Sequence, residues 1–146
     1  MSETTVPVAT APSTAPAPRA RRARVVLRGV QILLALFFGA ASALPKLIAH
    51  PAAVESFDRI GWGAPGMYTI GTLELAGAIA LLIPALQSVG AASLAALMVG
   101  AFITQVTVFD GENAATPLIV FVPLAVIAWA RRGTVTELAG LVRRQG

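Results

Sequence analysis

Apolar residues gather in four long runs along the chain, and short polar or breaker-rich stretches separate them. The runs cover Val25 to Leu44, Met67 to Pro84, Val89 to Phe109 and Pro117 to Trp129. A membrane-spanning helix needs about 20 mostly apolar residues, so each run predicts a span. The fourth run is short and could begin earlier, at Ala114. We therefore expect an all-α fold, a four-helix transmembrane bundle.

Two shorter segments have the periodicity of amphipathic helices. Between the first two runs, Pro51 to Ile60 places Val54, Phe57 and Ile60 on a side that would lie against the membrane or the bundle. At the C-terminus, the apolar positions of a second segment share one side: Val135, Leu138, Leu141 and Val142. Because Arg143 and Arg144 follow, this segment predicts a helix on an anionic membrane surface. Docking of a soluble partner is the alternative.

The chain divides into three parts on this basis. Residues 1–24 are rich in Pro, Ala and Arg and predict a disordered tail, residues 25–130 a four-span membrane domain, and residues 131–146 a basic amphipathic tail. A signal peptide is the alternative interpretation of the first run, because Ala41-Ser42-Ala43 resembles a cleavage site. We expect the run to be retained, because its polar residues have a purpose within a bundle.

Composition and charge agree with a membrane location. Of the 146 residues, 56% are hydrophobic and 12% charged, whereas soluble domains contain about 25% charged residues. The net charge of +4 comes largely from arginines that flank the apolar runs, which indicates membrane orientation and not nucleic-acid binding. The positive-inside rule then predicts a multi-pass protein with both termini cytoplasmic.

The content of reactive side chains limits the chemistry. The chain has no cysteine, which excludes disulfides, thiol redox reactions and thiolate-held metal clusters within it. Its single histidine, His50, stands at the outer edge of the bundle without a plausible set of metal ligands. We therefore expect no catalytic residues, no metal site and no covalently bound cofactor. An electron donor would have to be a partner protein.

One carboxylate lies in the middle of the second apolar run, at Glu74. An ionised acid at mid-bilayer costs roughly 3 kcal/mol or more, so such acids usually face a bundle interior and have a partner. Gly71 and Gly77 share its helix face and would let another helix approach. We expect Lys46 to reach Glu74 from the outer end of the first span, directly or through one water. The alternative is a protonated, hydrogen-bonded acid.

Polar and small residues also recur on single faces of the first and third spans. In the first span they follow one another at steps of three or four: Arg28, Gln31, Ala35, Gly39, Ser42 and Lys46. In the third span a small-residue stripe passes through Gly100, beside Thr104 and Gln105. The predicted intramembrane polar site comprises Glu74, Lys46, Gln31, Arg28, Thr104 and Gln105. Helix packing is predicted at Gly39, Gly71, Gly77 and Gly100.

Three blocks of the sequence together resemble the pattern of one known family. They are Arg28…Gly39…Lys46-Leu47, Val54-Glu55-Ser56-Phe57 and Ile70-Gly71-Thr72-Leu73-Glu74-Leu75-Ala76-Gly77. From about Val25 to Ala130 the chain resembles the DoxX-like family of small four-span bacterial membrane proteins. The resemblance implies a left-handed four-helix bundle in a bacterial plasma membrane. Many members carry a histidine in the third span where this chain has Thr104 and Gln105, so a proton relay through an imidazole is not expected there.

The resemblance also implies a class of function. Relatives include membrane subunits of thiosulfate:quinone oxidoreduction and proteins linked to oxidative-stress and sulfur-redox partners. We therefore expect an accessory or anchoring subunit of a membrane redox system, which if it belongs to an enzyme is a non-catalytic or quinone-facing subunit of an oxidoreductase. Quinone is the candidate cofactor. The candidate partners are the lipid bilayer, a cytoplasmic or membrane oxidoreductase and a second copy of the chain. The alternative is a small transporter, acting as an oligomer with Glu74 lining the path.

Overall fold

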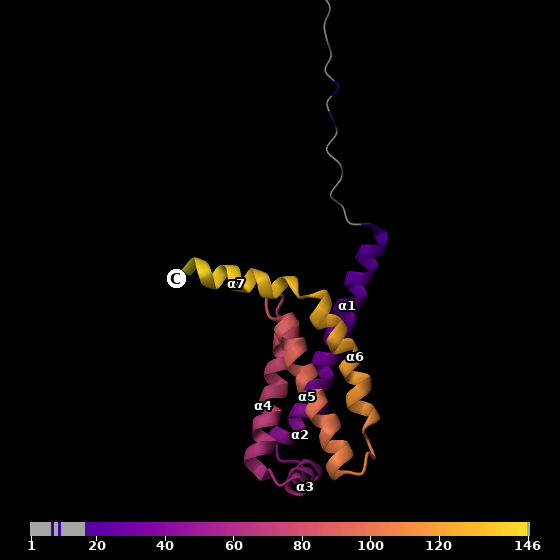
Figure 1. The fold of residues 1–146 in the computed structure, drawn as a ribbon, viewed down its shortest axis with the longest axis vertical. Helices are drawn as coiled ribbons and strands as arrows, with labels where there is room; N and C mark the ends of the chain where they lie inside the picture. Colours follow the sequence, from indigo (N-terminus) through magenta and orange to yellow (C-terminus); the bar gives the residue numbers. More distant parts are fainter. Residues whose placement is uncertain (1–6, 8, 10–16, 146) are drawn as a thin grey trace, which may run out of the picture.

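The computed structural model describes residues 7, 9 and 17–145. Most of the predicted N-terminal tail (residues 1–6, 8 and 10–16) and Gly146 lie outside the described residues. The elements are α1 (Pro18–Leu36), the π-helical segment η1 (Phe37–Ala43), α2 (Leu44–Leu47), α3 (Pro51–Ile60), α4 (Gly63–Leu82), α5 (Gln87–Val108), α6 (Ala115–Ala130) and α7 (Gly133–Gln145). The described residues include no strand, which confirms the predicted all-α class (Figure 1).

The first span begins earlier than its apolar run. Pro18 occupies the first helical position of α1, where its missing N–H costs nothing and its fixed φ suits a helix. The following Arg and Ala residues are good helix formers. Residues 18–24, predicted as part of the tail, are therefore helical, and the segment from Pro18 to Leu47 forms one continuous span.

The π-helical segment η1 ends at Ala43, two residues before Pro45. A proline within a helix usually kinks or loosens it, because proline has no N–H to donate. Instead the chain continues as a π-helix, and the Leu44 N–H donates to the Gly39 carbonyl five residues back. Wider turns of this kind are frequent at functional sites.

Three segments of the described chain have the length and composition of a membrane span: Pro18–Leu47, Gly63–Leu82 and Gln87–Val108. The fourth helix of the bundle, α6, has 16 residues, as the short fourth run predicted. It is followed by α7, whose axis bends away by 52°. Figure 1 shows α7 leaving the bundle sideways while α1, α4, α5 and α6 run alongside one another.

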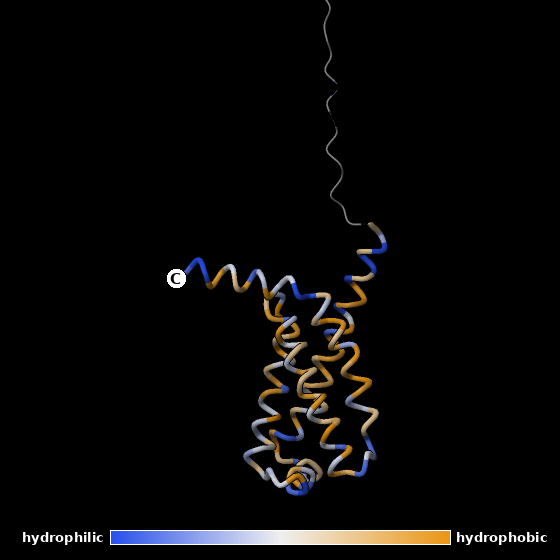
Figure 2. Tube along the Cα trace, viewed as in Figure 1, coloured by the Kyte–Doolittle hydropathy of each residue, from blue (hydrophilic) through white to orange (hydrophobic). Residues whose placement is uncertain are grey.

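The bundle has two different ends. The α3 end is crossed by α3, and the α7 end carries the start of α1, the turn between α4 and α5, and α7 (Figure 1). Figure 2 shows mainly apolar residues along the bundle and hydrophilic ones at both ends. Trp62 is exposed at the α3 end and Trp129 at the α7 end, where indole rings suit the membrane–water interfaces. Along α7, hydrophilic and apolar residues alternate, and no residue of that helix is buried.

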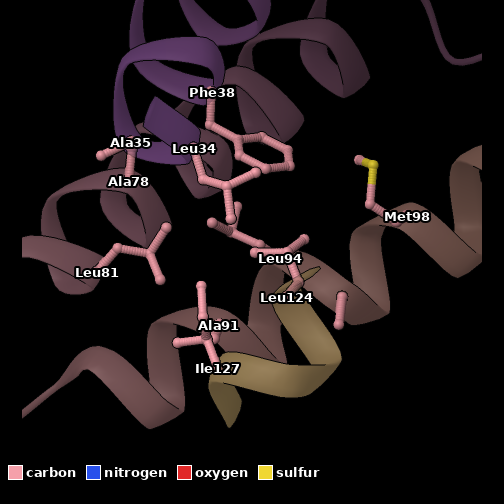
Figure 3. Packing of buried hydrophobic residues seen from close by; sticks show 11 residues of the cluster. Leu34, Ala35, Phe38, Ala78, Leu81, Ala91, Leu94, Met98, Leu124 and Ile127 are labelled. Atoms are coloured by element: carbon pink, nitrogen blue, oxygen red, sulfur yellow. The ribbon is translucent and has the colours of Figure 1, made fainter. Parts of the chain in front are cut away.

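The apolar core occupies the half of the bundle nearest the α7 end. It contains Leu34, Ala35, Phe38, Ala78, Leu81, Ala91, Leu94, Ala95, Met98, Leu124 and Ile127 (Figure 3). These residues come from α1, η1, the last turns of α4 and α6 and the first half of α5. Beyond Met98, by contrast, α5 has no buried residue up to its end at Val108. The bundle is therefore closely packed at one end and open at the other.

Glycines permit the close approach of α4 and α5. A Cβ added at Gly90 would lie 2.8 Å from the Ala80 Cβ and 3.1 Å from the Gly77 carbonyl oxygen. A Cβ added at Gly77 would lie 2.7 Å from the Leu94 side chain. At Gly100 nothing lies within 4 Å, so the prediction that the third span packs through Gly100 is wrong. The small stripe continues past the packed half of α5 into an open region.

Alanine substitutions should distinguish the closely packed Gly90 from Gly100, which has open space beside it. Gly90→Ala should lower the unfolding free energy by about 1–3 kcal/mol, because its methyl group meets backbone atoms of α4. Gly100→Ala should leave it unchanged or raise it by up to about 1 kcal/mol, because alanine is the better helix former. Thermal transitions of the two purified variants in one detergent measure the difference. A larger loss at Gly100 than at Gly90 would contradict the packing described here.

Candidate functional site

Three polar side chains form a closed cluster inside the bundle. The Lys46 ammonium lies 2.8 Å from Glu74 Oε2, and it also donates to the Ser42 carbonyl at 2.9 Å and to Ser42 Oγ at 3.1 Å. The Ser42 hydroxyl donates to Glu74 Oε1 at 3.0 Å. The side chain of Glu74 is 5% exposed and that of Lys46 is 17% exposed. The direct contact predicted between Lys46 and Glu74 is thus present, and Ser42 completes the cluster.

Local structure explains how these residues meet. Ser42 lies in η1 and Lys46 one turn later in α2, so both face α4. Gly71 lies one turn before Glu74, and a Cβ there would be only 2.9 Å from the Lys46 Cβ. The missing side chain at Gly71 therefore lets the lysine stem pass close to α4. Pairing also cancels two charges that would each be expensive to bury alone.

A cavity of about 570 Å³ opens beside Glu74, on the open half of the bundle. Its walls come from α3, α4, α5 and the turn between α5 and α6. The apolar lining includes Phe57, Ile60, Trp62, Ile70, Leu97, Met98 and Phe109. The polar lining includes Glu55, Ser56, Arg59, Glu74, Thr104, Gln105, Glu112 and Asn113. Mostly apolar walls with a few polar groups are typical of small-molecule sites, and the volume falls within their usual range.

Thr104 and Gln105 line this cavity together with Glu74, as members of the predicted site. The Thr104 hydroxyl donates to the Gly100 carbonyl at 2.9 Å. The Gln105 Oε1 atom is buried and accepts no hydrogen bond. A buried polar atom without a partner costs about 1–3 kcal/mol, so it favours a bound molecule that supplies a donor. Gly100 lines the same cavity, which explains why no neighbour contacts it.

Arg28 and Gln31 do not belong to this site. Arg28 donates to the Leu82 carbonyl at 3.1 Å, and Gln31 donates to the Leu81 carbonyl at 3.2 Å. These are the final carbonyls of α4, which have no partner within their own helix. Eleven residues separate Gln31 from Ser42, or about 16 Å at 1.5 Å per residue. The prediction of one site that includes both ends of the stripe is therefore corrected to two separate clusters.

The cluster at the α7 end ties four helices together. Gln31 is fully buried and donates to Gln87 Oε1 at 2.6 Å, and Arg131 reaches Gln31 Oε1 at 3.5 Å. Ser88 donates to the Ala128 carbonyl at 3.0 Å, joining α5 to α6. These contacts hold α1, α4, α5 and α6 in register. We assign this cluster a structural role.

Several cavity residues were absent from the predicted site. Phe57 is buried, and the apolar face of α3 that carries it was predicted to rest on the membrane or the bundle. The structure places that face across the end of the bundle, where it lines the cavity. The Arg59 guanidinium lies 4.6 Å from the centre of the Phe109 ring. His50 caps α3, accepting from the Ala52 N–H at 3.3 Å. No sequence signal linked α3 to α5, because their contact depends on the whole bundle.

The fold and the buried ion pair place the chain among small multi-pass membrane proteins. Comparison with known families is more specific, because the model of the DoxX-like family matches residues 29–139. The chain therefore belongs to the DoxX-like family. Neither a search of curated proteins nor a search of solved structures gave a match.

A double-mutant cycle measures the ion pair. Glu74→Gln should lower the unfolding free energy by about 3 kcal/mol, because it leaves Lys46 charged and largely buried without its partner. Adding Lys46→Met should recover much of that loss, since no unpaired charge remains. Thermal unfolding of the four proteins in one detergent gives the coupling energy. Additive effects of the two substitutions would contradict the pair and favour a neutral Glu74.

Proposed function

We propose that this DoxX-like protein is an accessory or anchoring subunit of a membrane redox system, linked to quinone or to sulfur and oxidative-stress chemistry. In this proposal the cavity beside Glu74 receives the head group of a quinone. The observation that carries it is the combination of an apolar cavity of about 570 Å³ with a hydrogen-bonded carboxylate in its wall. A lipid-soluble molecule with a small polar head needs both features.

The polar residues fit such a head group. Gln105 Oε1 is a buried acceptor without a partner, and the aromatic residues Phe57, Trp62 and Phe109 line the cavity. A bound quinone supplies two-electron, two-proton chemistry. For protons that must enter or leave the cavity, Glu74 Oε1 and Oε2 are acceptors, and Lys46 and Ser42 stabilise the charge on that carboxylate. The protein's contribution is therefore binding and proton handling.

Electrons would come from a partner oxidoreductase, because the chain has no cysteine to hold a metal cluster or form a redox disulfide. The α7 end suits an anchoring role. Leu141 and Val142 of α7 are exposed, and Arg143 and Arg144 follow them directly. We place this helix on the anionic cytoplasmic surface of the plasma membrane, where it can hold a partner close to the bundle.

The orientation follows from charge. Of the 11 basic residues, Lys46 and Arg59 lie towards the α3 end. The other nine are in the first part of α1 or follow α6, at the α7 end. At the α3 end, Glu55, Asp58, Asp110 and Glu112 outnumber these two cations. The positive-inside rule then supports cytoplasmic termini and a cavity on the opposite side of the membrane.

Labelling of introduced cysteines tests this orientation, because the chain has none of its own. Glu112→Cys and Thr136→Cys place exposed thiols at the α3 end and on α7. A membrane-impermeant maleimide added to intact cells should label only the first variant, and permeabilised cells should show both. Labelling of Thr136→Cys in intact cells would reverse the proposed topology.

Fluorescence tests quinone binding. Trp62 lines the cavity and Trp129 does not, so Trp129→Phe leaves Trp62 as the reporter. A short-chain benzoquinone added to this variant in lipid nanodiscs should quench Trp62 saturably. Adding Gly100→Leu should weaken binding at least about tenfold, because leucine fills the space that the head group needs.

Gly29→Leu is the matched control, since Gly29 also has no neighbour within 4 Å but lies on α1 outside the cavity. It should bind quinone as the parent does. Quenching that is linear in quinone, or equal in the Gly100→Leu and Gly29→Leu proteins, would show only collisions within the lipid and would overturn the proposal.

A further inference from the structure

The polar groups around Glu74 offer hydrogen-bond acceptors to the cavity and keep their donors for one another. Lys46 has three protons, and its ammonium donates to Ser42 O, Ser42 Oγ and Glu74 Oε2. The single Ser42 proton goes to Glu74 Oε1. Each carboxylate oxygen thus accepts one hydrogen bond and retains further lone pairs. A ligand beside Glu74 therefore meets hydrogen-bond acceptors and no free donor of this cluster.

The hydroxyl groups that line the cavity have the same character. Thr104 Oγ1 donates to the Gly100 carbonyl at 2.9 Å, and Ser56 Oγ donates to the Ala52 carbonyl at 2.8 Å. Their protons are committed to their own helices, so only lone pairs face a ligand. Gln105 Oε1 adds a buried acceptor with no partner. The lining donors that remain include Gln105 Nε2 on α5 and, from α3 and the turns at the α3 end, Arg59, Trp62 and Asn113.

Helix direction brings the two principal acceptors towards each other. Contact between Gly77 and Leu94 fixes the alignment of α4 and α5, which places Glu74 roughly level with Leu97 because the two helices run in opposite directions. Gln105 then lies about 12 Å further towards the α3 end, at 1.5 Å per residue. Long side chains on helices lean towards the helix N-terminus. Because α4 and α5 run in opposite directions, this lean brings the Glu74 and Gln105 side chains towards one another along the cavity that both residues line.

We propose that the cavity selects the reduced, hydroxyl-bearing form of its ligand, a hydroquinone or a related phenol, over the oxidised quinone. One hydroxyl donates to Glu74 and the other to Gln105 Oε1, while the aromatic and aliphatic walls contact the ring. A quinone offers only acceptors, so it would leave both positions without donors. This inference rests on the proposed function, because it concerns the same cavity.

Three probes with one ring and one short tail separate donor recognition from simple apolar binding: a hydroquinone, its quinone and its dimethyl ether. Binding is measured anaerobically to the full chain in nanodiscs by isothermal titration calorimetry. The hydroquinone should bind at least about tenfold more tightly than the dimethyl ether, which has the same ring but no donor. The quinone should also bind more weakly than the hydroquinone.

Gln105→Met tests the acceptor at the second position. It should weaken hydroquinone binding about tenfold and leave dimethyl ether binding unchanged, because only the hydroquinone donates to the lost oxygen. The thermal transition without ligand should stay or rise, since the variant removes a buried atom that has no partner. The same change on α7, Gln145→Met, is the control and should alter neither property.

The outcomes distinguish this inference from the proposed function. If the quinone or the dimethyl ether binds as tightly as the hydroquinone, or if Gln105→Met weakens all three equally, the donor-selective site is wrong while a ligand cavity stands. If none of the three probes binds, the proposed function fails, and this inference fails with it.

Discussion

A charged carboxylate inside a membrane bundle must be neutralised, and the arrangement of the first two spans depends on that requirement. Lys46 and Ser42 approach Glu74 from one side, and the glycine at position 71 leaves room for the lysine stem. The π-helical segment carries the serine, and the lysine follows four residues later in α2 on the same side of the helix. Charge, backbone form and a missing side chain therefore solve one problem together.

The same cluster divides the bundle into two halves with different properties. Towards the α7 end, Leu81, Leu94, Leu124 and Ile127 are fully buried and the helices meet closely. Towards the α3 end, α3, α4, α5 and the turn between α5 and α6 line a cavity. A rigid half can hold Glu74 in place while the open half receives a molecule. This separation resembles that of binding sites in general, where a packed scaffold positions a few polar groups.

Much of this arrangement could be predicted from the sequence because the membrane restricts the alternatives. Apolar length predicted the spans, and the cost of a buried acid predicted a partner for Glu74. The polar and small residues that share one face of the first span were a poorer guide to the site. Residues that share a helix face can lie at different depths, so Arg28 and Gln31 meet the end of α4 and not the carboxylate. Likewise, a small residue such as Gly100 permits contact but does not require it, and a cavity has no periodicity of its own to detect.

The first span is attached to α4 at two levels, through Gln31 at one and Lys46 at the other. Between fixed attachments, the number of residues must match the distance along the helix axis. The π-helical segment Phe37–Ala43 lies within this stretch, and its wider turns fit more residues into each turn than an α-helix does. The segment thus matches the number of residues between Gln31 and Lys46 to the distance between the two attachments. The extra residue of the π-helical segment is accommodated within the helix, while both attachments to α4 keep their places.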